Sequence, residues 1–380
     1  MDGFLLATPD GVVRATGARA AFDDAHTAAA ALHECKAGLI VGALPFDPRR
    51  PAALVEPEQA VHTAGPWRPA ALPELPAVQV ISELPSAAEH VARVAKLVEQ
   101  LADPRSPLRK VVAARSLLVE AETPLDPEVV AAHLVTRHPR ANVFAVDLGP
   151  AGRPGDTLLG ATPEVLVARH GHTITLHPLA GTVRRLADPE ADAAQARELL
   201  ASSKNQEEHA YVIDWIREQL APVCIELEIP DGPELLQTPE VWHLATPIRG
   251  RLRDHRTTAL DLALLLHPTP AICGTPTHLA LDAIVGTEED RGFYSGAVGW
   301  CDERGDGEWV VAIRCAELSA NGRALRAFGG GGIVAASDPL AELDETTAKL
   351  RTFLNGLAVS DLSSASLRTG SRPRRRSMEP

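Results

Sequence analysis

The stretch "TPEVLVARHGHTITLHPLAGT", residues 162–182, decides the fold class. Apolar and β-branched residues precede and follow His170-Gly171, and two such runs separated by a short turn predict a β-hairpin. A hairpin joins antiparallel strands, whereas parallel strands need a long crossover connection. The stretch therefore indicates an antiparallel sheet.

The elements around this hairpin do not follow a regular strand–helix alternation. Residues 1–80 mix short apolar runs with proline, which predicts short strands and turns. Further strands are predicted at 108–120, 141–149, 307–318 and 323–335, and helices at 86–102, 127–138 and 188–223, the last as one helix or two. This order favours an antiparallel α+β architecture over a doubly wound sheet.

Composition and charge limit the function classes. The chain has 380 residues, 45% of them hydrophobic, and a net charge of -13, which argues against a nucleic-acid partner. The five cysteines form no CxxC pair, which is typical of reduced thiols in a cytoplasmic protein. No signal peptide or membrane span is predicted. We expect one domain over 1–358 and a disordered basic tail over 359–380, where Ser, Arg and Pro dominate.

Charged residues on two predicted helices suggest a site for a hard cation. Glu342, Glu345 and Lys349 share one helix face in "SDPLAELDETTAKL", 337–350. Glu208 lies at the edge of an apolar stripe in another helix, where a bare carboxylate needs a partner. An i,i+4 pair between Glu208 and Lys204 is the structural alternative. Carboxylates brought together from two helices would suit Mg²⁺.

Two strand patterns point to anion recognition. In "GEWVVAIRCAEL", 307–318, alternation places Arg314 on a face with small residues, which leaves room to bind a carboxylate. An internal ion pair is the alternative. In "FGGGGIV", 328–334, four consecutive glycines weaken a strand, so they predict either close approach to an anionic ligand or a bulge or bend.

Two ionisable residues begin apolar strands. Lys110 begins "KVVAARS" and Glu164 precedes "VLV". Burial lowers the pKa of a lysine and raises that of a glutamate, so the pair could act as base and acid. Two separate surface charges at strand ends are the alternative, and the sequence does not show that the two residues meet.

Ten segments, taken together and in order, resemble the chorismate-utilising enzymes, which include anthranilate synthase component I, aminodeoxychorismate synthase component I, salicylate synthase and isochorismate synthase. The resemblance is dense from about residue 105 to 356. Its segments are "KVVAARS", "LLGATPEVLV", "HPLAGTVRR", "SSKNQEEH", "VWHLATPIRG", "LHPTPAICGTP", "DRGFYSGAVGW", "EWVVAIRC", "GGGGIVAASDP" and "ELDETTAKL". It implies a single-domain antiparallel β-sandwich with helices outside, Mg²⁺ as cofactor and chorismate as substrate.

The same resemblance implies roles for individual residues. Glu208 and Glu345 match metal ligands, and Glu342 matches a ligand that acts through water. Lys110 matches the base that activates water, and Glu164 the acid that protonates the departing hydroxyl. The substrate-binding residues implied are Gly181, His243, Ala271, Tyr294, Arg314, Gly330 and Lys349, with Tyr294 at the enolpyruvyl carboxylate.

Motif wording within the family favours isochorismate synthase. Ala180 stands where lysine-nucleophile aminodeoxychorismate synthases carry lysine, and the "LLES" motif of anthranilate synthases is missing, so no amidotransferase subunit is expected. Salicylate synthases tend toward "ITASG" where this chain reads "PAICG". Salicylate synthase is the first alternative, and a non-catalytic relative that binds chorismate or a partner is the second. The family also implies a monomer, with siderophore, salicylate or menaquinone routes open downstream.

Overall fold

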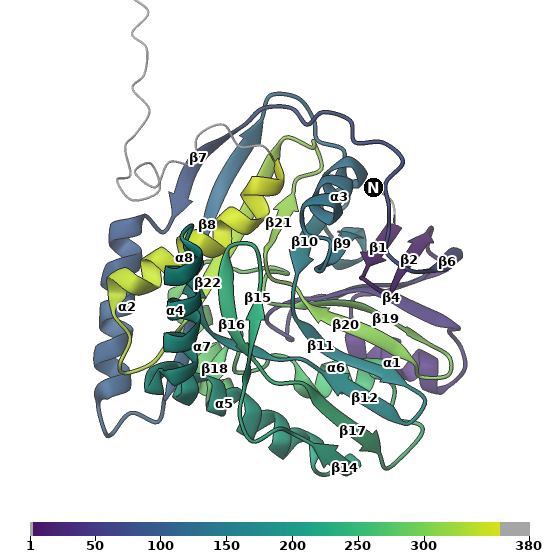
Figure 1. Cartoon of the computed structure of the whole chain (residues 1–380). Helices are drawn as coiled ribbons and strands as arrows, with labels where there is room; N and C mark the ends of the chain where they lie inside the picture. Colours follow the sequence, from purple (N-terminus) through teal and green to yellow (C-terminus); the bar gives the residue numbers. More distant parts are fainter. Residues whose placement is uncertain (1–2, 358–380) are drawn as a thin grey trace, which may run out of the picture.

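Two large antiparallel sheets form the body of the protein. The structure, a computed structural model, describes residues 3–357 (Figure 1). One sheet has ten strands, in the order β18 (Gly274–Thr275), β8 (Lys110–Ala121), β22 (Ala324–Ile333), β21 (Cys315–Leu318), β10 (Thr157–Thr162), β9 (Asn142–Asp147), β1 (Gly3–Ala7), β2 (Gly11–Thr16) and β6 (Gln59–Ala64), with β7 (Val78–Leu84) also pairing with β8.

The second sheet has nine strands and a third has three. The nine-stranded order is β14 (Cys224–Glu228), β17 (Ile248–Leu252), β12 (Thr173–Leu176), β11 (Val165–His170), β20 (Gly307–Val311), β19 (Ala297–Asp302), β4 (Leu39–Leu44), β5 (Ala53–Glu56) and β3 (Ala20–Phe22). The small sheet contains β13 (Leu179–Arg184), β16 (Val241–Ala245) and β15 (Glu234–Gln237).

Side-chain alternation along the strands shows that the large sheets form a sandwich. Phe4 and Leu6 of β1 share one core cluster with Val41 and Ala43 of β4, so these inner faces pack together. The intervening residues, such as Leu5 of β1, enter clusters on the outer faces. The predicted antiparallel sandwich with outer helices is confirmed.

Helices cover both outer faces of the sandwich. Apolar residues of α1 (Ala25–His33), α5 (Ser203–Leu220) and α6 (Ala259–Leu266) join the outer core of the nine-stranded sheet, and those of α3 (Pro127–Arg137) and α8 (Pro339–Leu354) join that of the ten-stranded sheet. Figure 1 shows α8 lying across β22, with α2 (Ala87–Ala102) beside it. The remaining helices are α4 (Pro189–Ala201), α7 (Thr277–Thr287), η1 (Gly149–Ala151) and η2 (Asn355–Leu357).

Several predicted elements are confirmed because their signals are local. The hairpin forms as β11 and β12, with Ala168 opposite Thr175. Helix α2 begins after Ser86, whose hydroxyl and the Glu89 carboxylate make a reciprocal capping box. The segment 188–223 contains two helices, α4 and α5.

Two predictions about secondary structure are wrong. The segment 307–318 is not one strand, because the chain crosses from β20 in one large sheet to β21 in the other. Arg314 lies in this crossing with a φ of 51°, so the alternation that placed it with small residues does not exist. The prediction for residues 1–80 also missed α1, an alanine-rich helix capped by Asp24.

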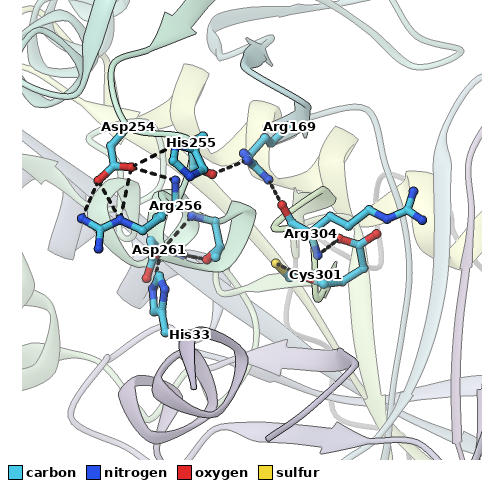
Figure 2. Close-up of polar contacts among 10 residues, drawn as sticks. His33, Arg169, Asp254, His255, Arg256, Asp261, Cys301 and Arg304 are labelled. Carbon is cyan, nitrogen blue, oxygen red and sulfur yellow. Dashed lines mark hydrogen bonds and ion pairs between the residues drawn. The ribbon is translucent and has the colours of Figure 1, made fainter. Parts of the chain in front are cut away.

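A polar network fixes the loops around the start of α6 (Figure 2). Arg169 of β11 donates to the main-chain oxygens of Arg304 and His255, each at 2.8 Å. His33 Nε2 lies 2.9 Å from Asp261 Oδ2 and so connects α1 with α6. These contacts stabilise the loops without lining the recess described below.

Two predictions concern the chain as a whole. Among residues 3–357, none of the helices combines the length and apolar character that a membrane crossing requires. The predicted basic tail, 359–380, lies outside the described residues. The single domain proposed for 1–358 stays a prediction.

Candidate active site

A recess lies where β21 and β22 separate. Strand β21 pairs with β22 as far as Ala327, whereas β22 continues to Ile333. The recess therefore borders the glycine-rich half of β22. Of the twelve predicted site residues, nine line it: Glu164, Gly181, Glu208, His243, Ala271, Tyr294, Arg314, Gly330 and Lys349. The other three, Lys110, Glu342 and Glu345, each contact the polar cluster described next.

Three glutamates each pair with a different lysine. Lys110 Nζ lies 3.1 Å from Glu208 Oε1, which connects β8 with α5. Lys110 is fully buried, so the ion pair supplies the countercharge that a buried ammonium requires. Burial disfavours ionisation of Glu208, but the charges of Lys110, Lys204 and Lys349 outweigh it and lower the pKa of the carboxyl.

Glu342 is the most crowded of the three carboxylates. Its Oε1 accepts from Lys204 Nζ at 2.6 Å and from Ser337 Oγ at 2.7 Å. Its Oε2 is buried and has no hydrogen-bond partner within residues 3–357. Burial and the nearby charge of Glu345 raise the pKa of Glu342 to about 7. The predicted alternative, a pair between Lys204 and Glu208, is wrong, because Lys204 reaches α8 instead.

Glu345 completes the cluster from α8. It accepts from Lys349 Nζ at 2.6 Å, and the same ammonium donates to the Gly330 carbonyl at 2.9 Å. Lys349 therefore fixes α8 against the glycine-rich part of β22 and presents a positive charge to the recess. The shared helix face predicted for Glu342, Glu345 and Lys349 is confirmed as a contact surface against β22.

The donor set of this cluster suits Mg²⁺. Carboxylate oxygens are the ligands that this ion prefers, and the partnerless Oε2 of Glu342 is an acceptor in need of a cation. With the carboxylates turned toward their lysines, no group of three His, Cys, Asp or Glu side chains in the described part of the chain could hold a metal ion as it stands. Metal binding would therefore require the lysines to release these oxygens.

Side chains of the site explain three of the four glycines of β22. A Cβ at Gly332 would overlap Glu208 Oε1, and one at Gly330 would lie 2.7 Å from the Tyr294 hydroxyl. A Cβ at Gly331 would lie 3.0 Å from Glu342 Oε2. The register between β22 and β8 is continuous from Ala324 to Ile333, so the predicted alternative of a bulge is wrong, whereas that of a bend stays a prediction. Approach of a ligand to these glycines stays a prediction.

Arg314 is held in position by a histidine. Its Nη2 lies 3.1 Å from His243 Nε2, and His243 Nδ1 lies 2.9 Å from Thr182 Oγ1. Burial, together with the charge of Arg314, holds the pKa of His243 well below its ordinary value, so the ring is neutral. A guanidinium only donates, so Nε2 accepts and Nδ1 carries the proton toward Thr182. This order aims a buried cation into the recess.

Glu164 has the environment of a carboxylic acid at neutral pH. It is buried, and this burial raises its pKa to about 7. Two contacts act to lower the pKa of Glu164. The Leu179 N–H donates to its Oε1 at 3.3 Å, and Lys110 carries a positive charge. Lys110 and Glu164 are thus close enough to interact, which the sequence could not show.

The recess also has walls that sequence reasoning missed. Phe328 stacks on Tyr294 with ring centroids 4.9 Å apart, and burial raises the pKa of Tyr294 to about 12. Thr182 and Ser295 line the recess too. Thr182 lies in the quoted "PLAGT" segment and could have been found from it, whereas Ser295 carries no sequence signal beyond "FYSG".

Comparison with known proteins identifies the family. A model described as chorismate binding enzyme matches residues 57–358. A Mycobacterium tuberculosis protein assigned as isochorismate synthase MenF is 49% identical over 363 residues, covering 94% of this chain and 96% of that protein. The isochorismate synthase DhbC of Bacillus subtilis is 43% identical over 330 residues, covering 85% of this chain and 82% of its own. The chain belongs to the chorismate-binding enzyme family.

A solved structure supports the fold. The menaquinone-specific isochorismate synthase MenF of Escherichia coli superimposes with a TM-score of 0.80 at 24% identity, covering 93% of this chain and 89% of that one. At this identity the likeness concerns the fold alone. The predicted family is confirmed, and the family model begins well before residue 105, where the recognised segments begin.

Proposed function

We propose that this protein is an isochorismate synthase, an isomerase that converts chorismate to isochorismate. The predicted activity is confirmed by its relatives at 49% and 43% identity, which are named for it. The single structural observation that carries the proposal is the recess that joins a buried acid, Glu164, to two anchoring cations, Arg314 and Lys349. Chorismate has two carboxylates, and two separate cations can hold both.

The family resemblance implies each catalytic role, and the position of the residue supports it. Protonated Glu164 would donate a proton to the departing C4 hydroxyl, since burial raises its pKa to about 7 and so leaves a large share of the carboxyl protonated at neutral pH. Lys110 would take the proton from water attacking C2 as the ring double bonds shift. That role requires Lys110 to be a neutral amine, because an ammonium such as the one that pairs with Glu208 has no free lone pair.

Substrate positioning falls to the remaining residues. Arg314, oriented by His243, and Lys349 would each bind a carboxylate, with Tyr294 beside the enolpyruvyl group. Gly181, Ala271 and Gly330 would present their main chain to the substrate. Glu208 and Glu345 would hold Mg²⁺, with Glu342 acting through water. When bound, the ion would supply Lewis-acid polarisation of the ring carboxylate.

Product analysis tests this proposal. The purified protein is incubated with chorismate and Mg²⁺, with an EDTA control, and the products are separated by chromatography. Isochorismate in equilibrium with chorismate, formed without pyruvate and abolished by EDTA, is the expected result. Salicylate with pyruvate would establish the salicylate synthase alternative instead. Chorismate binding without turnover would leave the non-catalytic alternative.

The biological setting is also part of the proposal. We expect a cytoplasmic monomer that needs neither nucleic acid nor an amidotransferase subunit, as predicted from the sequence. Sedimentation analysis of the purified protein checks the monomer. The relatives' names include both a MenF-type and a DhbC-type synthase, so the downstream route stays open.

A further inference from the structure

A second pocket, lined by four arginines, lies next to the catalytic recess. It has a volume of about 280 Å³ and is formed by β8, the start of α2, the segment after α7 and β22. Its arginines are Arg93, Arg115, Arg291 and Arg326. We call it the arginine pocket. Phe328 belongs to the walls of both the recess and the arginine pocket, so the two sites are neighbours.

Two of the four arginines are well paired. Arg291 donates to Glu288 Oε2 at 2.8 Å and to the main-chain oxygens of Ile272 and Val112. Arg326 donates to Glu289 Oε2 at 2.7 Å and to Ser116 Oγ at 3.0 Å. The charges of these two side chains are therefore already balanced.

Arg115 lacks such compensation. Its side chain is 0% exposed, and its carboxylate contact is a long one, 3.4 Å from Nη2 to Glu83 Oε2. Nε and Nη1 have no hydrogen-bond partner among the described residues. Burial raises the pKa of Glu83, the carboxyl that forms this ion pair with Arg115. A buried guanidinium in this state is expected to have another partner.

The neighbours of Arg115, Arg93 and His90, also have buried donors without a hydrogen-bond acceptor among the described residues. Arg93 Nη1 lies 3.7 Å from Glu288 Oε1. Its Nη2 donates to His90 Nδ1 and to the Ala114 carbonyl. Its Nε has no partner within the described chain. Burial, assisted by the charges of Arg93 and Arg115, lowers the pKa of His90 to about 3. His90 is thus neutral with its proton on Nε2, another buried donor that lacks an acceptor in residues 3–357.

Four buried donors of Arg115, Arg93 and His90 therefore lack an acceptor in residues 3–357, although each guanidinium keeps one contact with a carboxylate. We infer that the arginine pocket binds a small oxyanion, a carboxylate or a phosphate, between Arg93 and Arg115. Planar guanidinium groups bind both kinds of oxyanion through paired, charge-assisted hydrogen bonds. The apolar side chains of Leu84, Pro85 and Phe328 leave space for a small apolar body attached to the charged group. This site takes no part in the proposed isomerisation.

Calorimetric titration at constant ionic strength tests the inference on the whole protein, with inorganic phosphate and benzoate as separate probes. We expect one saturable site for at least one probe. The double variant Arg115→Met, Glu83→Gln removes the Arg115 guanidinium together with its carboxylate partner, and should weaken binding about tenfold or more, the loss expected for a charge-assisted hydrogen bond. Arg93→Met should act in the same direction.

Two controls separate this site from other charges. Arg256→Met removes an exposed arginine and should leave anion binding unchanged. Arg314→Met removes the cation of the catalytic recess and should also leave it unchanged. Binding that is lost in Arg314→Met but kept in the Arg115 variant would place the anion in the catalytic recess and overturn the inference, as would no binding of either probe. These outcomes do not depend on turnover.

Discussion

The catalytic recess and the loop network of Figure 2 both use charged side chains, but they pair them differently. In the network, Asp254 binds Arg256 two residues on, and Arg169 donates to main-chain oxygens. In the cluster beside the recess, Lys204 binds Glu342 across 138 positions, and one buried oxygen of Glu342 has no partner within the described residues. Local pairs hold loops in place, whereas the distant pairs bring carboxylates of α5 and α8 together beside the recess.

The largest effect should come from breaking the carboxylate cluster. Glu208→Gln removes one proposed metal ligand and leaves the buried Lys110 without its acid partner. We expect kcat to fall about thousandfold, since a bound metal supplies several kcal/mol of charge stabilisation. Steady-state kinetics against Mg²⁺ concentration measures it. Glu207→Gln, at the exposed neighbouring position, is the control. Full activity with unchanged Mg²⁺ dependence in Glu208→Gln would refute the ligand assignment.

The next effect concerns the proposed acid. Glu164→Gln should lower kcat about 10²- to 10³-fold, the contribution of a positioned proton donor, with little change in chorismate affinity. The pKa of Glu164 is raised to about 7, so the active, protonated form is lost as pH increases through that value. The wild-type rate should therefore decline above about pH 7. A pH–rate profile of the variant that keeps the same alkaline limb would contradict the assignment.

Glu164 should also affect how the free energy of unfolding depends on pH. Its pKa is about 7 in the folded chain against an ordinary 4.5, so ionising Glu164 destabilises the folded state as pH rises from 4.5 through 7. Relative to the wild type, Glu164→Gln should gain up to about 3 kcal/mol of unfolding free energy between pH 4.5 and pH 8. Urea unfolding at both pH values measures the gain. An equal difference at both values would show that burial does not hold the proton.

A smaller effect on kcat should follow from adding a side chain in the glycine-rich part of β22. Gly332→Ala adds a Cβ that overlaps Glu208 Oε1 and approaches Lys110 Cε, so it should displace both residues and reduce kcat about tenfold. Gly331→Ala is the matched control, because its Cβ would stand 3.0 Å from Glu342 Oε2 and needs a smaller adjustment. Kinetics of the two variants side by side give the answer. Equal activities would mean that the close approach at Gly332 is unimportant.

The smallest effect should be confined to the loop network. Thr258→Ala removes the hydroxyl that caps α6 and pairs with Asp261. Loss of a helix cap lowers the unfolding free energy by about 1 kcal/mol. Thermal unfolding should show this loss while kcat and KM stay at wild-type values. A change in KM would show that the network reaches the recess and is not only structural.

Much of the fold and of the candidate site was predictable from the sequence. The signals are either local residue patterns or short segments that resemble those of a known family. The hairpin at His170-Gly171 and the capping box at Ser86 require only neighbouring residues. The recognised segments also named residues that line the recess, such as Glu164 and Arg314. These segments did not explain physically why Arg314 points into the recess.

Long-range contacts decided the rest. Arg314 reaches the recess because the chain changes sheets beside it, an event invisible in the alternation of "VVAIRCAEL". The partner of Lys204 lies on another helix, and the interaction of Lys110 with Glu164 depends on how two strands are placed. Likewise, only the packed structure shows that donors of the arginine pocket are buried without a hydrogen-bond partner among the described residues.

The sequence by itself determined the antiparallel class, the capped helices and the family, because periodicity, caps and motif order are written in neighbouring residues. Only the tertiary structure decided which lysine pairs with which glutamate, why β22 carries four glycines, and how far burial shifts the pKa of Glu164. Pairing and desolvation depend on distances between residues remote in the chain, and those distances exist only once the sheets have packed.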